Sequence, residues 1–141
     1  MSGDFIDSNV ILSAYDSTDA RKQILAGGLI QSALSNGGAW ISFQVVQEVL
    51  NVVTRRLTPR FSAEDAGRLL AGILAPLWRV MPSQDLYRTA LDIQWRYGYS
   101  FYDALIIAAA LASGCDRLYS EDLQAGQTIE NLRIVDPFAE A

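Results

Sequence analysis

Two kinds of hydrophobic pattern alternate along the chain. Short apolar runs are separated by longer segments in which apolar side chains recur every three to four positions. Short runs of this kind are typical of buried strands, and the longer segments are typical of helices with one buried face. The pattern predicts strands at 4–7, 39–42, 77–81, 117–120 and 132–135, and helices at 8–15, 17–36, 43–56, 62–74, 84–97 and 101–113.

Polar residues, glycines and prolines mark the expected ends of these helices. Ser8 or Asn9 is expected to cap the first helix, and Ser17 or Thr18 the second. Glycines follow several of the predicted helices, as is common at helix ends. Pro76 is expected to end the fourth helix, because proline lacks the amide hydrogen that a helix interior needs.

The alternation of short strands with helices predicts a three-layer α/β/α domain around a central, mainly parallel five-stranded sheet. The chain has 141 residues and half of them are hydrophobic, so it can bury a core of its own. No repeat or linker interrupts the pattern, and we expect a single domain over residues 1–141. Trp40, Trp78 and Trp95 are expected to pack in its core rather than to stack on bases.

The composition excludes several kinds of active site. The chain has no histidine, which rules out a Ser-His-Asp triad, a Cys-His pair and a histidine-ligated zinc site. Its single cysteine, Cys115, cannot form an internal disulfide and is expected to be a small buried residue. Any catalytic chemistry must therefore come from carboxylates, hydroxyls, amides, lysine and arginine.

The net charge of −5 bears on the choice of partner. Binding to nucleic acid is driven largely by lysine and arginine, which argues against such a partner for an acidic chain. If several acids formed one metal site, however, bound divalent cations would invert the local field, and the arginines could still contact phosphates. Arg55, Arg56 and Arg60 are candidates, although a solvated helix end is the simpler interpretation.

The sequence predicts no membrane segment and no export signal. The longest apolar run, 104–112, is much shorter than a membrane span. The N-terminal residues lack the basic and apolar regions of a signal peptide. We therefore expect a cytoplasmic protein.

Four acids lie in or beside apolar sequence, where an unpaired carboxylate is costly. Asp7 ends the first strand, and Glu48 lies beside the apolar stripe of the helix that follows the second strand. Asp103 is in the first turn of a nearly all-apolar helix, and Asp122 follows the fourth strand. Because functional groups gather at the carboxyl ends of parallel strands, we expect these acids to meet at one rim.

Each acid also has a simpler interpretation. Asp7 could cap the following helix, Asp103 could offset the helix macrodipole, Asp122 could be a turn residue and Glu48 could be solvated. Four independent accidents would then have to place acids where one fold brings them together. Mutual repulsion raises the pKa values of such a cluster, and a divalent cation removes that penalty. Oxygen ligands without histidine or cysteine favour Mg²⁺ or Mn²⁺.

Four motifs carry a specific resemblance to a known family. They are Phe5-Ile6-Asp7-Ser8-Asn9-Val10, Ser42-Phe43-Gln44-Val45-Val46-Gln47-Glu48, Tyr102-Asp103-Ala104-Leu105-Ile106-Ile107-Ala108-Ala109-Ala110 and Leu118-Tyr119-Ser120-Glu121-Asp122-Leu123. In this order and at these separations they resemble the motifs of PIN-domain ribonucleases, and within that family the VapC-type toxins of bacterial toxin–antitoxin modules. The resemblance runs from about Asp4 to Val135. Ser8 and Ser120 stand where the family often has threonine, and both keep the hydroxyl.

The resemblance implies metal-dependent endonucleolytic cleavage of single-stranded RNA. It makes Asp7, Glu48 and Asp103 ligands of Mg²⁺ or Mn²⁺ and Asp122 a fourth acid, so that all four belong to the catalytic and metal-binding set. Glu121 precedes Asp122 directly, which leaves two candidates for the inward-pointing acid. We favour Asp122.

The resemblance also implies supporting residues and partners. Asn9, Ser42 and Ser120 would orient the carboxylates through hydrogen bonds, although helix capping explains Ser42 equally well. A cognate antitoxin would bind exposed apolar surface on the early helices and block the acidic site. A homodimer is implied as well.

Three other kinds of protein place acids in a similar way or share this fold. A response-regulator receiver domain also sets acids at strand ends, but it needs a lysine after its last strands, and the only lysine here is Lys22, in an early helix. A haloacid-dehalogenase-like phosphatase has a second aspartate two residues after its nucleophile, where this chain has Asn9. A catalytically inactive PIN-fold binding or scaffold domain is the remaining alternative, and the sequence alone leaves it open.

Overall fold

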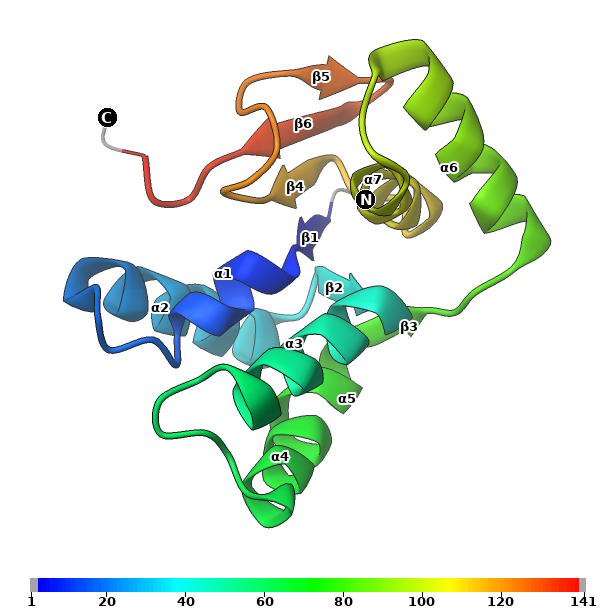
Figure 1. Cartoon of the computed structure of the whole chain (residues 1–141). Coiled ribbons are helices and arrows are strands. Elements are labelled where there is room, and N and C mark those ends of the chain that lie inside the picture. Colours follow the sequence, from blue (N-terminus) through cyan, green and yellow to red (C-terminus); the bar gives the residue numbers. More distant parts are fainter. Residues whose placement is uncertain (1–2, 140–141) are drawn as a thin grey trace.

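A single six-stranded sheet runs through the molecule in the order β3-β2-β1-β4-β6-β5 (Figure 1). The computed structural model describes residues 3–139. All neighbouring strands are parallel except β5 and β6, which form an antiparallel pair. The strands are β1 (Asp4–Ile6), β2 (Ala39–Ser42), β3 (Trp78–Val80), β4 (Arg117–Tyr119), β5 (Thr128–Ile129) and β6 (Leu132–Val135).

Helices connect the parallel strands and cover the sheet. They are α1 (Ser8–Ser13), α2 (Ala20–Asn36), α3 (Phe43–Arg55), α4 (Ala63–Leu69), α5 (Ala75–Leu77), α6 (Gln84–Tyr97) and α7 (Phe101–Ala112), with a π-helical segment, η1 (Leu70–Leu74), between α4 and α5. In Figure 1, α1 and α2 lie to one side of the line of strands, and α6 and α7 lie to the other. The predicted α/β architecture with a mainly parallel sheet is confirmed.

The prediction of five strands was wrong, because the sheet has a sixth strand, β5. This strand contains only Thr128 and Ile129 and pairs with the start of β6. Glu130, in the turn between the two strands, has a φ of 54°, a left-handed conformation that is uncommon outside glycine. A strand of two residues is too short to produce an alternating pattern in the sequence.

Several helix ends also differ from the prediction. Asp7 caps α1 and Asp19 caps α2, whereas Ser8, Asn9, Ser17 and Thr18 were expected to do so. In both cases the aspartate carboxylate accepts a backbone amide of the first turn.

Pro76 does not end a helix at residue 74. It lies at the start of α5, directly after the π-helical segment η1, and the helical path continues to Leu77. Because Pro76 follows a π-helical turn and lies one residue before the helical path ends, its missing amide hydrogen and its ring disturb few intrahelical contacts.

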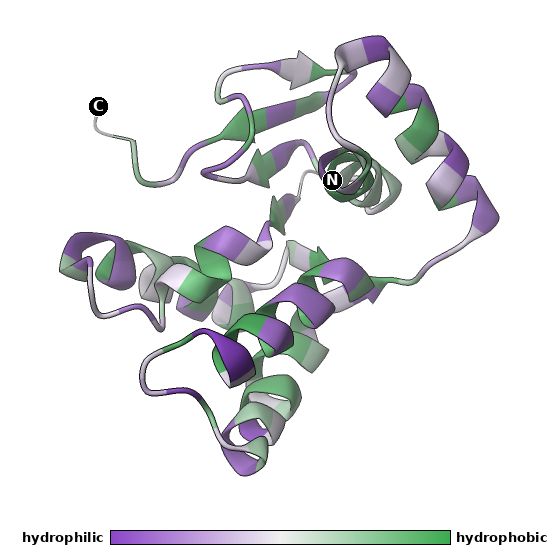
Figure 2. Ribbon diagram, in the orientation of Figure 1, coloured by the Kyte–Doolittle hydropathy of each residue, from purple (hydrophilic) through white to green (hydrophobic). Residues whose placement is uncertain are grey.

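The middle of the sheet and one helix form the core. Phe5 and Ile6 of β1 and Leu118 of β4 are almost completely buried, and every residue of α7 from Ala104 to Ala110 is buried. Figure 2 shows the contrast between largely hydrophobic α7 and α6, in which hydrophilic and hydrophobic residues alternate. Because β1 lies between β2 and β4, its carboxyl end, where Asp7 follows, is at the centre of the rim.

Two of the three tryptophans lie outside the core, contrary to expectation. Trp95 on α6 is 91% exposed, and Trp78 in the edge strand β3 is 37% exposed. Trp40 packs against the core as a half-buried residue, and the Arg79 guanidinium lies 4.6 Å from its ring centroid. Cys115 is buried, as predicted. Within residues 3–139, no helix combines the length and apolar character needed to cross the lipid bilayer.

Candidate active site

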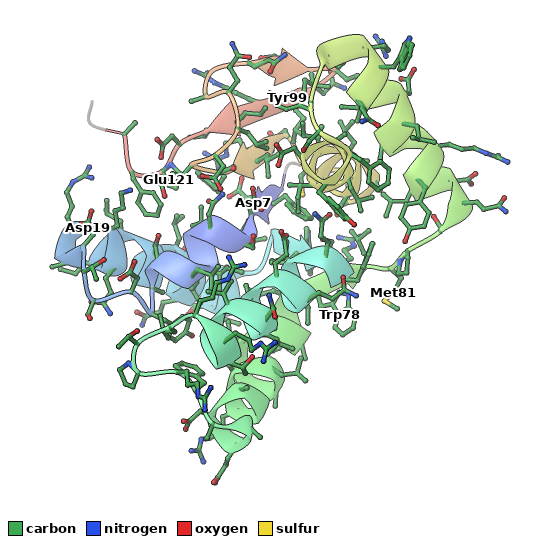
Figure 3. All side chains as sticks on the ribbon, viewed as in Figure 1. Asp7, Asp19, Trp78, Met81, Tyr99 and Glu121 are labelled. Carbon is green, nitrogen blue, oxygen red and sulfur yellow. The ribbon has the colours of Figure 1, made fainter. Side chains whose placement is uncertain are left out.

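Asp7 lies at the junction of β1 and α1, at the centre of the carboxyl rim (Figure 3). It is 6% exposed. Its Oδ1 accepts the Ser8 amide at 2.7 Å, and its Oδ2 accepts the Ser120 hydroxyl at 2.8 Å. Burial raises the pKa of Asp7 to about 6, with smaller contributions from the charges of Asp122 and Asp103, while these hydrogen bonds oppose the rise.

Ser8 links Asp7 to the second acid. Its hydroxyl lies 3.3 Å from Glu48 Oε1 and 3.4 Å from Asp7 Oδ1, in position to donate to either carboxylate. Partial burial of the carboxylate, together with repulsion by Asp7, raises the pKa of Glu48 to about 7, although the residue as a whole is exposed. The helix α3 therefore brings Glu48 to the rim of the sheet, as the sequence predicted.

Asn9 connects three residues of the rim. Its Nδ2 lies 3.3 Å from Asp7 Oδ2, 3.3 Å from Ser120 Oγ and 3.1 Å from Asp122 Oδ2. Its Oδ1 accepts the Glu121 amide at 3.1 Å. The amide side chain thus ties α1 to the segment after β4 and holds Asp122 toward Asp7.

The side chains of Glu121 and Asp122 have different partners. The Lys22 ammonium on α2 forms an ion pair with Glu121, whereas Asp122 accepts from Asn9. Of the two side chains, that of Asp122 therefore joins the hydrogen-bonded rim, whereas Glu121 contributes its backbone amide. The sequence could not decide between the two acids, because the partner of Glu121 lies 99 residues earlier in the chain.

Asp103 approaches the rim from α7. It lies in the first turn of this helix, whose cap Ser100 accepts the Asp103 amide at 3.3 Å. Its carboxylate makes no hydrogen bond within residues 3–139, but its negative charge contributes to the raised pKa values of Asp7 and Glu48. The structure thus gathers all four predicted acids at one rim, with Asp7 buried at its base and Glu48 and Asp122 exposed.

Ser42 has a different position from the other predicted supporting residues. It is fully buried, and its hydroxyl accepts the Val45 amide at 3.4 Å as the cap of α3. In the described part of the chain it makes no hydrogen bond to an acid. The capping interpretation therefore accounts for its contact, whereas Asn9 and Ser120 do contact carboxylates.

A model of the PIN domain family matches residues 5–128. The chain belongs to the PIN-domain family. This match includes the four acids, together with the rim residues Ser8, Asn9 and Ser120.

Solved structures share the PIN fold of this chain. VapC20 of Mycobacterium tuberculosis, described as a sarcin-ricin loop cleaving toxin, has 24% identity, covers 85% of this chain and 90% of its own, and gives a TM-score of 0.65. A toxin–antitoxin complex from Klebsiella pneumoniae has 17% identity, with coverage of 96% and 98% and a TM-score of 0.70. FitAcB of Neisseria gonorrhoeae has 17% identity, with coverage of 96% and 98% and a TM-score of 0.62. At these identities the likeness shows the fold. A search of curated proteins finds no match.

The acids of this PIN domain are the residue types that bind hard cations, but their side chains are not arranged around a common point. Among residues 3–139, no group of three or more Asp, Glu, His or Cys side chains is already arranged to hold a metal ion. The atoms that the four acids offer to a metal ion are all carboxylate oxygens. Asp7 and Glu48 have no lysine or arginine partner in the described part of the chain. Carboxylate oxygens of this kind are the ligands that Mg²⁺ and Mn²⁺ prefer.

Two contacts of the PIN-domain rim were not predicted. Ser8 lies inside the first motif, and its contact with Glu48 follows from the pairing of β1 with β2. Gln44 is 5% exposed, and its Nε2 donates to the Tyr102 carbonyl at 3.1 Å, which joins α3 to the start of α7. The one available signal for Gln44 was a polar residue among the apolar positions of the α3 stripe.

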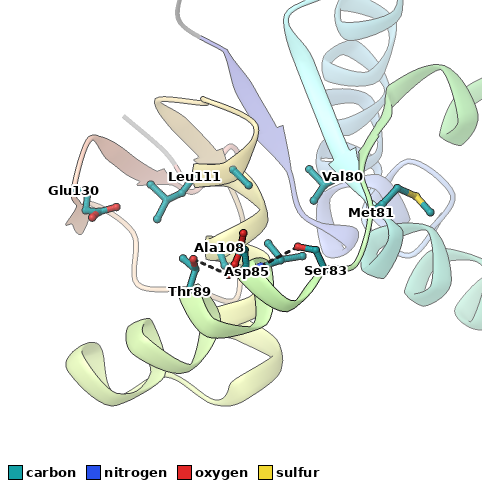
Figure 4. Close-up of a pocket in the computed structure, with 10 residues that line it drawn as sticks. Val80, Met81, Ser83, Asp85, Thr89, Ala108, Leu111 and Glu130 are labelled. Carbon is teal, nitrogen blue, oxygen red and sulfur yellow. Dashed lines mark hydrogen bonds between the residues drawn. The ribbon is translucent and has the colours of Figure 1, made fainter.

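A separate hollow lies away from the acids. It has a volume of about 340 Å³ and is formed by the end of β3, the start of α6, the second half of α7 and the turn after β5, with Ser83 and Asp85 at one side (Figure 4). None of the four rim acids lines it. It therefore has no part in the chemistry of the rim.

Proposed function

We propose that this PIN domain is a metal-dependent endoribonuclease that cleaves phosphodiester bonds in single-stranded RNA. The observation that carries the proposal is the Asp7–Ser8–Glu48 contact, in which two carboxylates with raised pKa values share one hydroxyl and lack a cationic partner. Like charges held this close are costly unless a cation binds between them. A structural role for these acids would not require them to face each other.

Asp7, Glu48 and Asp103 would hold Mg²⁺ or Mn²⁺, with Asp122 as the fourth acid. When bound, the ion would supply Lewis-acid chemistry, which lowers the pKa of a water and neutralises charge on the attacked phosphate. This chemistry removes the need for a histidine base, which the chain lacks.

The other rim residues would position these carboxylates. Ser120 and Ser8 donate to the two oxygens of Asp7, so the plane of its carboxylate is fixed from both sides. Asn9 holds Asp122 toward the same site. Hydrogen bonds of this kind orient ligand groups before a cation arrives, which reduces the cost of assembling the site.

The proposal extends to a toxin of a toxin–antitoxin pair, in which a cognate antitoxin binds this chain. The neighbouring structures from Mycobacterium tuberculosis and Klebsiella pneumoniae, described as a toxin and a toxin–antitoxin complex, support this extension. A groove of about 460 Å³ on the early helices offers apolar surface for the antitoxin. It is lined by Ala14, Tyr15, Gly27, Ile30, Gln31, Leu34, Ser35 and Ile73.

A homodimer is part of the same proposal. The outer face of α6 carries Tyr87, Leu91 and Trp95 at four-residue spacing, and these side chains are 38%, 54% and 91% exposed. Exposed apolar stripes of this kind mark interaction surfaces. We further infer that residues 1–141 act as one domain and that the reaction takes place in the cytoplasm.

The alternative is a catalytically inactive PIN-fold binding domain. It is favoured by one observation, the absence of an already formed three-ligand group within residues 3–139. In such a protein the acids would remain at the rim without closing on an ion.

Incubation with total RNA separates the two functions. The purified protein is incubated with total RNA in Mg²⁺ or Mn²⁺, with and without EDTA, and the cut ends are mapped. The nuclease produces discrete new ends that disappear with EDTA. An RNA population that is unchanged in either ion, or cleavage that persists in EDTA, contradicts the proposal.

A further inference from the structure

Tyr102 presents an exposed aromatic ring on the first turn of α7. It is 69% exposed, whereas the residues of α7 from Ala104 to Ala110 are all buried, and it immediately precedes Asp103. An aromatic side chain left in water forgoes the burial that usually stabilises it. The ring is therefore available to a ligand that reaches the acid rim.

The Tyr102 ring packs against one neighbouring ring. Its centroid lies 5.7 Å from that of Phe101 with the planes at 73°, an edge contact, and Phe101 lies 6.3 Å from Tyr87. On the backbone side, Gln44 donates to the Tyr102 carbonyl. A tyrosine side chain has two torsions, so it loses little conformational entropy when a second ring stacks on it, which favours binding.

We propose that Tyr102 is a stacking platform for an unpaired base of single-stranded RNA, next to the phosphate attacked at the acid rim. The inference rests on the proposed nuclease function, because Asp103 fixes where that phosphate lies relative to Tyr102. Stacking accepts any base, since every base has a π face. The platform would therefore orient the strand without selecting its sequence.

The charge of the protein favours such a contact. The chain has a net charge of −5. Lys22 is the basic residue among the described rim contacts, and it already forms an ion pair with Glu121. Electrostatic attraction to phosphates is therefore weak at the rim before a cation binds. Base stacking on Tyr102 supplies affinity that depends on neither lysine nor arginine.

Binding of a fluorescent 2′-O-methyl oligoadenylate in Mg²⁺ tests the platform without relying on cleavage, and a gel checks that the probe stays intact. Tyr102→Leu keeps an apolar helix-forming side chain but removes the ring, and is expected to weaken binding about tenfold, which corresponds to about 1.4 kcal/mol. Tyr102→Phe keeps the ring, and is expected to bind within about twofold of the wild type. Both variants should unfold at the wild-type temperature, because the side chain is largely exposed.

A probe with a single abasic position completes the test. Moved along the oligoadenylate, the abasic position should weaken binding of the wild type at one site and have no further effect on Tyr102→Leu, because the two changes remove the same contact. Equal affinity of wild type and Tyr102→Leu overturns the inference, as does a Phe variant as weak as the Leu variant. Absence of RNA cleavage by the wild type would instead overturn the proposed function. The binding result would still decide whether Tyr102 stacks on a base.

Discussion

At the scale of single residues, one ion pair determines which of two adjacent acids faces the rim. Lys22 pairs with Glu121, and Asn9 holds Asp122. Asp122→Asn is therefore expected to reduce the RNA-cleavage rate by roughly tenfold or more, because it removes a charge from the proposed cation site. Glu121→Gln, the matched change at the neighbouring position, should cleave at about the wild-type rate. Equal losses in the two variants would contradict this assignment.

Glu48 gives a stability test that needs no RNA. Because the pKa of Glu48 is raised from 4.5 to about 7, ionisation of Glu48 costs the folded state stability as the pH rises through this interval, and the full cost is present above pH 7. Glu48→Gln is expected to raise the unfolding temperature of the metal-free protein at pH 8 by about 4 °C, or roughly 1 kcal/mol after allowance for solvent screening. At pH 5 wild-type Glu48 is already protonated in the folded state, and the difference should shrink. Equal unfolding temperatures at pH 8, or a less stable variant, would contradict the raised pKa.

At the scale of elements, Gln44 joins α3 to α7 at an energetic cost. Its Nε2 reaches the Tyr102 carbonyl, but its buried Oε1 has no partner within residues 3–139. Gln44→Leu is expected to leave the free energy of unfolding unchanged or to raise it by about 1 kcal/mol, since it removes an unsatisfied oxygen. The Tyr102 carbonyl keeps its intrahelical bond in α7.

Urea unfolding of Gln44→Leu measures this cost. Exposed Gln47 on the same helix provides the matched control, and Gln47→Leu should change stability by no more than about 0.5 kcal/mol. A loss of roughly 2 kcal/mol or more in Gln44→Leu would show that both polar atoms of Gln44 are satisfied.

The elements also show what the sequence could predict. The predicted bounds lie close to the observed bounds for strands and for helices with long periodic patterns, such as α3 and α7. Local pattern missed β5, which is formed by pairing with β6, and misplaced the cap of α2, because several polar residues precede that helix. Pro76 was misread because the π-helical turn before it has no recognisable sequence pattern.

At the scale of the whole molecule, the sequence predicted the parallel sheet and therefore the convergence of distant acids at its rim. It could not predict how the side chains are held there, since the contacts of Asn9 with Asp122 and of Ser8 with Glu48 span 113 and 40 residues. The exposure of Trp95 could not be predicted either, because the sequence does not distinguish an apolar residue on an outer face from one in the core.

The stability of the whole chain should depend on pH in an unusual direction. The folded state binds protons on Asp7 and Glu48 more tightly than the unfolded state does, so the metal-free protein loses stability as the pH rises from about 4 to about 7. The shift of Asp7 from 3.8 to about 6 alone amounts to about 3 kcal/mol. Mg²⁺ should restore stability at pH 7.5 but much less at pH 5, where the carboxylates are protonated. Thermal unfolding at the two pH values checks this, and a metal-free protein that is more stable at pH 7.5 would contradict it.

Asp103 offers the most direct test of the acid rim, because its carboxylate makes no hydrogen bond within residues 3–139, and its loss should not disturb the fold. Asp85 is the matched control, an exposed acid in the first turn of α6. The measurement is the rate of Mg²⁺-dependent RNA cleavage by wild type, Asp103→Asn and Asp85→Asn. Asp103→Asn should cleave roughly a hundredfold more slowly or worse while Asp85→Asn matches the wild type. Cleavage by Asp103→Asn at the wild-type rate would contradict the metal-dependent nuclease site.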